Sequence, residues 1–114
     1  MVLAVGPMLR PTLAATDGLD VAVAYTSTPR PFDAAGLRAL LPPGPTATVV
    51  MVEPYLAGTS SWAVADALRD VPHRLLALGV GRADLHKYGH PKDHARAHGL
   101  DAAGLRRSIT AFLP

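Results

Sequence analysis

The side chains that could do chemistry gather between the third β-type run of the chain and the helical segment after it. Glu53 ends the β-type run, a glycine-containing turn follows, and the helical segment opens with the hydroxyl residues Thr59, Ser60 and Ser61. Backbone N–H groups and hydroxyls at the start of a helix can hold an anion. The alternative is that Ser60 or Ser61 only caps the helix.

Glu53 is open to two interpretations. As a general acid or base it would need a partner, but no histidine or second carboxylate accompanies it in the sequence. A free-standing hydrolase that uses Glu53 with a distant histidine is therefore a minor hypothesis. The other interpretation is a buried interface anchor that accepts hydrogen bonds from the amides of the following turn.

The residues around this turn also suggest a contact surface. Arg30, which follows the second β-type run, is expected near the same strand ends and could join Thr59, Ser60 and Ser61 in an anion site. Tyr55, Leu56 and Trp62 are expected to form an exposed apolar patch, since a lone tryptophan beside a loop often anchors an interface. The alternative for Trp62 is an ordinary place in the core.

Four histidines recur at every fourth position, and they are His86, His90, His94 and His98. On one continuous helix they would share a face and could bind a metal ion. Gly89 and Pro91 interrupt such a helix, so only His94 and His98 remain as a pair, without an H-E-x-x-H arrangement. We therefore expect no metal site, and histidines on the surface or at an interface.

Composition narrows the class of protein. The 114 residues are 49% hydrophobic and 18% charged, which indicates one folded domain over residues 1–114. The formal net charge of +2 predicts no nucleic-acid surface, and no apolar run reaches the length of a membrane span. The absence of cysteine fits a cytoplasmic protein. Neither G-x-G-x-x-G nor a Walker A loop follows the first β-type run, so nucleotide binding is not expected.

Apolar runs alternate with segments of helical spacing. The expected strands are Val2–Val5 and residues 21–25, 47–52 and 74–78. The expected helices are residues 7–16, 33–41, 60 or 61–69, 91–98 and 101–113, with Asp33 and Asp101 as N-caps and Gly99 as a helix stop.

The strands lack polar alternation, which is typical of strands buried on both faces. Right-handed strand–helix–strand crossovers then predict a parallel sheet with helices on both sides. The expected fold is a Rossmann-like three-layer α/β/α domain with four parallel strands in the order 2-1-3-4.

Three blocks of sequence resemble the C-terminal domain of transketolase-type, thiamine-diphosphate-dependent enzymes. That group includes transketolase, 1-deoxyxylulose-5-phosphate synthase and the β-subunits of 2-oxoacid dehydrogenases. Residues 27–33 (STPRPFD) resemble the family's (K/R)P-(L/F)-D turn, and residues 50–53 (VMVE) with 58–60 (GTS) resemble its V-x-V-E segment and glycine-rich turn. Residues 78–81 (LGVG), 88–89 (YG) and 98–105 (HGLDAAGL) resemble the block that ends in H-G-L-D-x-x-G-I. Two departures are Pro54-Tyr55 after Glu53, and a turn with fewer glycines.

The resemblance implies a supporting role for this chain. In such enzymes other domains bind thiamine diphosphate and Mg²⁺ through a G-D-G … N motif and supply the activating glutamate. This sequence has no G-D-G triplet and no asparagine, so no catalytic or cofactor-binding residue carries over to it. The expected partners are the thiamine-binding domains or subunits, in a homo- or hetero-oligomer. Family members usually begin this domain with a short antiparallel strand, so one sheet edge is expected to be unpaired here. The rival function is a regulatory anion- or metabolite-binding module that uses the turn before Ser60.

Overall fold

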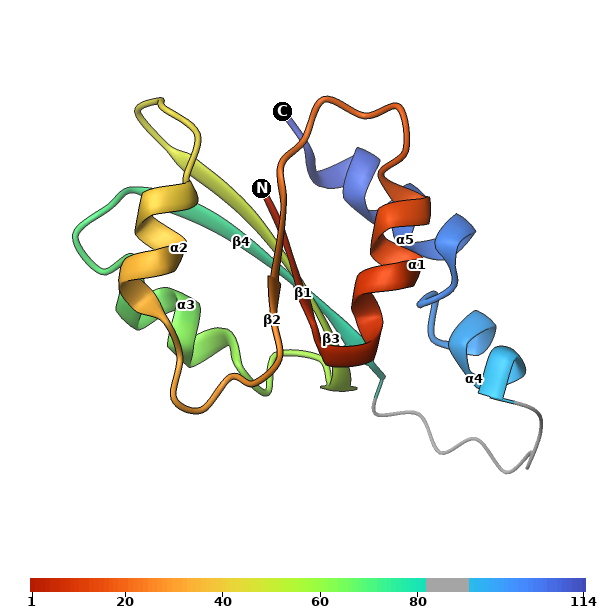
Figure 1. Ribbon diagram of the computed structural model, residues 1–114. Helices are drawn as coiled ribbons and strands as arrows, with labels where there is room; N and C mark the ends of the chain where they lie inside the picture. Colours follow the sequence, from red (N-terminus) through yellow and green to blue (C-terminus); the bar gives the residue numbers. More distant parts are fainter. Residues whose placement is uncertain (82–90) are drawn as a thin grey trace.

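The strands lie in one parallel sheet. The computed structural model describes residues 1–81 and 91–114, and in it four strands are ordered β2-β1-β3-β4, all parallel (Figure 1). Their bounds are Val2–Val5 for β1, Val23–Thr26 for β2, Ala47–Leu56 for β3 and His73–Val80 for β4. The predicted strand order and direction are confirmed.

Helices cover both faces of this sheet (Figure 1). One face is covered by α2 (Ala34–Leu40) and α3 (Ser61–Ala67). The other is covered by α1 (Leu9–Ala15), which follows the short 3-10 helix η1 (Gly6–Met8), and by α5 (Ala102–Phe112). Helix α4 (Pro91–Ala97) lies on the α1 and α5 side, toward the carboxyl ends of the strands. The predicted three layers are therefore present. None of these described helices is long and apolar enough to cross a membrane.

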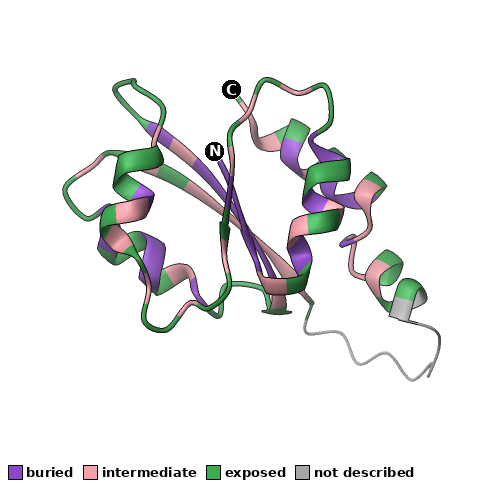
Figure 2. Cartoon of the chain, in the orientation of Figure 1, coloured by how far each residue is buried: buried purple, intermediate pink, exposed green. Residues whose placement is uncertain are grey.

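The two central strands divide the core into two clusters. All four residues of β1 are buried (Figure 2). In β3, successive side chains point to opposite faces of the sheet. Val49 and Met51 pack with α2 and α3, whereas Val50 and Val52 pack with α1 and α5. Strands buried on both faces need apolar residues at every position, which explains the missing alternation in the sequence.

Two elements differ from the sequence expectation. The helix expected over residues 7–16 begins as a 3-10 turn, because Pro7 has no backbone N–H to donate and fits a first turn. Strand β3 continues to Leu56 rather than ending at Val52, because Leu56 pairs with Val80 after an irregularity in the register.

Aspartate caps hold two helices as predicted. The Asp33 carboxylate accepts from the Gly36 N–H at 2.9 Å, and the Asp101 carboxylate accepts from the Gly104 N–H at 3.0 Å. Gly99 has a φ of +68°, which suits the helix stop expected there.

Replacing Asp101 by alanine should lower the free energy of unfolding by about 1 kcal/mol, because the Gly104 N–H loses its acceptor at the start of α5. Urea denaturation measures this change. Asp101→Asn serves as a control because it keeps an oxygen acceptor and should lose much less. An equal loss in both variants would mean that the cap is not the cause.

Candidate functional site

Glu53 is fully buried at the carboxyl end of β3. It is 0% exposed and lies on the face of the sheet that carries Val49 and Met51, toward α3. Its Oε1 accepts a hydrogen bond from the backbone N–H of Ser60 at 3.3 Å. Glu53 thus ties the strand end to the start of α3 through a turn amide, which is one of the two arrangements expected from the sequence.

The other carboxylate oxygen of Glu53 is not satisfied. Oε2 is buried and accepts no hydrogen bond from any part of the chain that the structure describes. Buried polar groups are normally hydrogen-bonded, since leaving one unpaired costs about 1–3 kcal/mol. A donor from outside the described residues could therefore form a hydrogen bond with Oε2 at this strand end.

The turn between β3 and α3 uses its polar groups internally. The Thr59 hydroxyl donates to the carbonyl of Leu56, and the Ser61 N–H donates to the carbonyl of Gly58 at 3.2 Å. Ser60 occupies the N-cap position and is buried, but its hydroxyl makes no capping hydrogen bond. The expectation that a serine hydroxyl caps this helix is thus wrong for Ser60, whose own N–H is the group that donates to the Glu53 carboxylate. Negative charge already present at the helix start also opposes binding of a further anion.

Three large apolar side chains at the end of β3 and the start of α3 are exposed. Tyr55, Leu56 and Trp62 are 42%, 39% and 48% exposed. The guanidinium of Arg30, from the loop between β2 and α2, lies 5.0 Å from the centre of the Trp62 ring. We call Arg30, Tyr55, Leu56 and Trp62 the β3-end patch. The core position considered for Trp62 is wrong, since nearly half of its surface is accessible.

Replacing Trp62 by alanine should lower the unfolding free energy of the chain alone by at most about 1 kcal/mol, the size of an exposed cation–π pair. Leu68→Ala is the matched comparison, because Leu68 is fully buried and its truncation should cost about 3 kcal/mol. Denaturant unfolding separates the two. A loss of similar size for Trp62→Ala would show that Trp62 stabilises the fold rather than presenting a surface.

Gly79 allows the strand end to lie close against β4. A Cβ at this position would come 2.5 Å from the carbonyl oxygen of Tyr55 and 2.8 Å from the Cα of Ala57. The Ala57 N–H also donates to the Val80 carbonyl at 2.9 Å, and this hydrogen bond holds the same two segments together. The sequence interpretation quoted Gly79 in a motif but assigned it no role. That role becomes visible only when β4 is placed against the end of β3, which is far away in the sequence.

The histidines are only partly placed. His86 and His90 lie outside the described residues, as does the 88–89 part of the third motif. His94 and His98 lie on and just after α4, where the Nδ1 of His98 accepts from the Gly81 N–H at 2.9 Å. Within residues 1–81 and 91–114, no group of three or more His, Cys, Asp or Glu residues could hold a metal ion.

Comparisons with known proteins cover nearly the whole chain. It is 54% identical over 115 residues to an uncharacterized 33.6 kDa protein in the fasciation locus of Rhodococcoides fascians, covering 99% of this chain and 36% of that protein. It is 34% identical over 114 residues to the 1-deoxy-D-xylulose-5-phosphate synthase of Verminephrobacter eiseniae, covering 99% of this chain and 18% of the enzyme. No protein-family model matches the chain.

A solved structure has the same fold. A split-gene transketolase, solved as an inactive beta4 tetramer, superposes with a TM-score of 0.69 at 22% identity, over 98% of this chain and 38% of that chain. The present chain thus spans between about a fifth and two fifths of the length of the proteins it matches. The resemblance predicted from the sequence is confirmed: in sequence and in fold this chain is similar to the C-terminal domain of transketolase-type enzymes.

Proposed function

We propose that this chain is the C-terminal domain, or a separate subunit, of a cytoplasmic transketolase-like enzyme that uses thiamine diphosphate to transfer two-carbon ketol or acyl units. It does not catalyse alone and supports assembly of the dimer or of the subunits. The observation that carries the proposal is the match of 99% of the chain to 18% of a 1-deoxy-D-xylulose-5-phosphate synthase. If this chain corresponds to a single supporting domain of the enzyme, the match should cover nearly all of this chain and only a small part of the enzyme, as it does.

The residues of this chain do not fit a site for the cofactor. Transketolase-type enzymes hold the diphosphate and Mg²⁺ through a G-D-G … N motif, and this sequence has neither the triplet nor any asparagine. The described residues also lack a cluster of three metal-binding side chains. The proposal therefore assigns thiamine diphosphate and Mg²⁺ to the partner domains, and no step of the reaction to this chain.

The β3-end patch is the surface proposed for assembly. It combines exposed aromatic and aliphatic side chains with an arginine, which are the residue types that dominate protein–protein contacts. Beside it, Glu53 Oε2 is a buried acceptor without a donor among the described residues, and a partner's N–H or O–H group would have to displace part of the turn before α3 to reach it. In the split-gene transketolase this fold makes up 38% of a chain that was solved as a tetramer, which supports the idea that the fold can belong to a separate, oligomeric subunit.

The rival anion module at Arg30 and Thr59–Ser61 is the weaker candidate. The Ser60 amide already donates to a carboxylate, and the Thr59 hydroxyl already donates to Leu56. If the module existed, inorganic phosphate would raise the melting temperature, and Ser60→Ala with Ser61→Ala would abolish the rise. The assembly proposal expects no such dependence on these two serines.

Two measurements test the assembly proposal. Calorimetry of the chain alone with thiamine diphosphate and Mg²⁺ should show no binding. Adding the thiamine-binding domains, as a separate polypeptide, should give ketol or acyl transfer that disappears when this chain is omitted. Thiamine diphosphate binding by the lone chain, or full activity of the thiamine-binding polypeptide without it, would overturn the proposal.

A further inference from the structure

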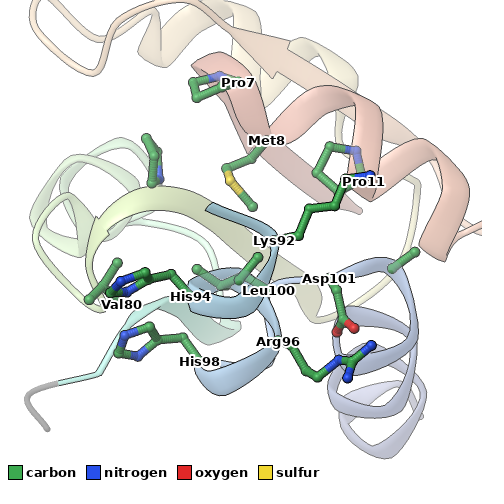
Figure 3. Close-up of a pocket in the computed structure, with 13 residues that line it drawn as sticks. Pro7, Met8, Pro11, Val80, Lys92, His94, Arg96, His98, Leu100 and Asp101 are labelled. Atoms are coloured by element: carbon green, nitrogen blue, oxygen red, sulfur yellow. The ribbon is translucent and has the colours of Figure 1, made fainter. Parts of the chain in front are cut away.

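A hollow in the described part of the molecule lies away from the turn before α3. It has a volume of roughly 830 Å³ and lies between α4 and the start of α1, outside the carboxyl ends of β1, β3 and β4 (Figure 3). Pro7 and Met8 line it directly after β1, and Pro54 lines it from the end of β3. A volume of this size accommodates a small organic molecule.

The topology of the sheet favours a ligand at this place. The chain leaves β1 toward β2 on one side, whereas it leaves β3 toward β4 on the other. Open parallel sheets bind their ligands outside the carboxyl ends of the strands, where the strand order reverses in this way. In this sheet the reversal falls between β1 and β3, and residues that follow both strands line the hollow.

The floor of the hollow is apolar. Met8 and Leu100 are 8% and 7% exposed, so each presents only a small face to the opening. Pro11, Pro54 and Val80 add further carbon surface around them. Proline rings and buried side chains have little freedom to move, so this floor suits the apolar body of a ligand without much ordering cost.

The wall formed by α4 is rich in basic side chains. Lys92, His94, Arg96 and His98 all line the hollow. Lys92 extends from α4 toward Pro11, whereas His94 and His98 point to the side of Val80 (Figure 3). Among the described residues that line the hollow, Asp101 is the one acid, and its Oδ1 accepts from Gly104 at the start of α5. The described lining therefore sets the cations of Lys92 and Arg96, together with the histidine ring nitrogens, against one carboxylate.

His98 is held in a defined orientation. Its Nδ1 accepts the Gly81 N–H at 2.9 Å, so in the neutral ring the proton is on Nε2. That nitrogen is then a donor fixed by a backbone contact rather than a freely rotating surface group. A fixed donor in a hollow that is also lined by the cations of Lys92 and Arg96 is suited to an oxyanion.

We propose that this hollow binds a small organic anion, with its phosphate or carboxylate group at the basic side chains of α4 and its apolar body against Met8, Pro54 and Leu100. The site is separate from the turn before α3 and does not depend on the assembly proposed above. It gives the chain a means of sensing a metabolite whether or not the partner domains are present.

The test is an NMR titration of the full chain with phenyl phosphate, benzoate and the neutral analogue benzamide. Amide signals of Met8, Val80 and Leu100 should shift along one saturable curve with at least one of the two anions, and not with benzamide. A response to phenyl phosphate alone would assign a phosphate group to the ligand, and a response to benzoate alone would assign a carboxylate. The double variant Lys92→Gln and Arg96→Gln should weaken binding at least about tenfold, which corresponds to about 1.4 kcal/mol.

Two control variants make this test specific. Arg38→Gln with Arg69→Gln removes the same charge from α2 and from the end of α3, on the opposite face of the sheet, and should leave binding unchanged. Ser60→Ala with Ser61→Ala should also leave it unchanged. The proposal is wrong if neither anion gives a saturable shift up to about 10 mM. It is also wrong if benzamide acts like the anions, or if the two arginine substitutions weaken binding as much as the α4 substitutions do.

Discussion

Replacing Gly79 by alanine should lower the unfolding free energy by about 3 kcal/mol and the melting temperature by roughly 10 °C. The new methyl carbon would lie 2.5 Å from the Tyr55 carbonyl oxygen and within 3 Å of Ala57 backbone atoms. Backbone atoms cannot rotate away as a flexible side chain does, so the end of β3 must separate from β4. The Ala57 to Val80 hydrogen bond should be lost with it.

Gly81→Ala is the matched control for this substitution. A methyl carbon at Gly81 would meet its nearest neighbour, the His98 ring, at 3.4 Å, which is close to ordinary van der Waals contact. We expect it to cost less than about 1 kcal/mol in the same thermal and urea measurements. Equal losses in the two variants would show that the lower stability comes from losing glycine flexibility at the end of β4, and not from a clash with the backbone of Tyr55 and Ala57.

The sequence predicted the sheet because burial leaves a strong local signal. Strands β1 and β3 are apolar at nearly every position, and the helices between them carry apolar residues at helical spacing. The end of β3 gave no such signal, since residues 53–56 (EPYL) contain a charge and a proline. Its extension to Leu56 depends on pairing with Val80, 24 positions away, which no local pattern shows.

The candidate site was only partly predictable for the same reason. The residue types around Glu53 and Ser60 were recognised, and their local spacing suggested a serine cap or an anion cradle. In the structure the Glu53 carboxylate accepts the Ser60 amide seven positions later, as in the second interpretation of Glu53. Such a contact joins a strand end to a helix start, so the choice among these interpretations can be made only once β3 and α3 are placed.

Replacing Glu53 by glutamine should affect association far more than folding. In the chain alone, the amide oxygen of glutamine can still accept the Ser60 N–H, and removing a buried charge offsets the cost of an unpaired NH₂ group. We therefore expect the unfolding free energy to stay within about 1 kcal/mol of the parent chain. Urea unfolding of the chain alone tests this part of the prediction.

Assembly with the thiamine-binding polypeptide should weaken about 10- to 100-fold in the same variant, as expected for losing a hydrogen bond to a charged acceptor. A donor from the partner that meets Oε2 in the parent chain would face an NH₂ group instead. Calorimetric titration of the two polypeptides measures the change. Asp66→Asn is the control, because it removes the same charge from an exposed carboxylate on α3 and should leave the affinity unchanged.

The two measurements together decide what the buried carboxylate is for. An unchanged affinity for Glu53→Gln would mean that no partner donor reaches Oε2, and the β3-end patch would lose its strongest support as an interface. A chain that fails to fold as Glu53→Gln would make the carboxylate a structural cap of α3 alone. Stable folding with weakened assembly is the result expected of an interface anchor, because losing a structural cap lowers the stability of the fold and losing the exposed Asp66 charge should leave the affinity unchanged.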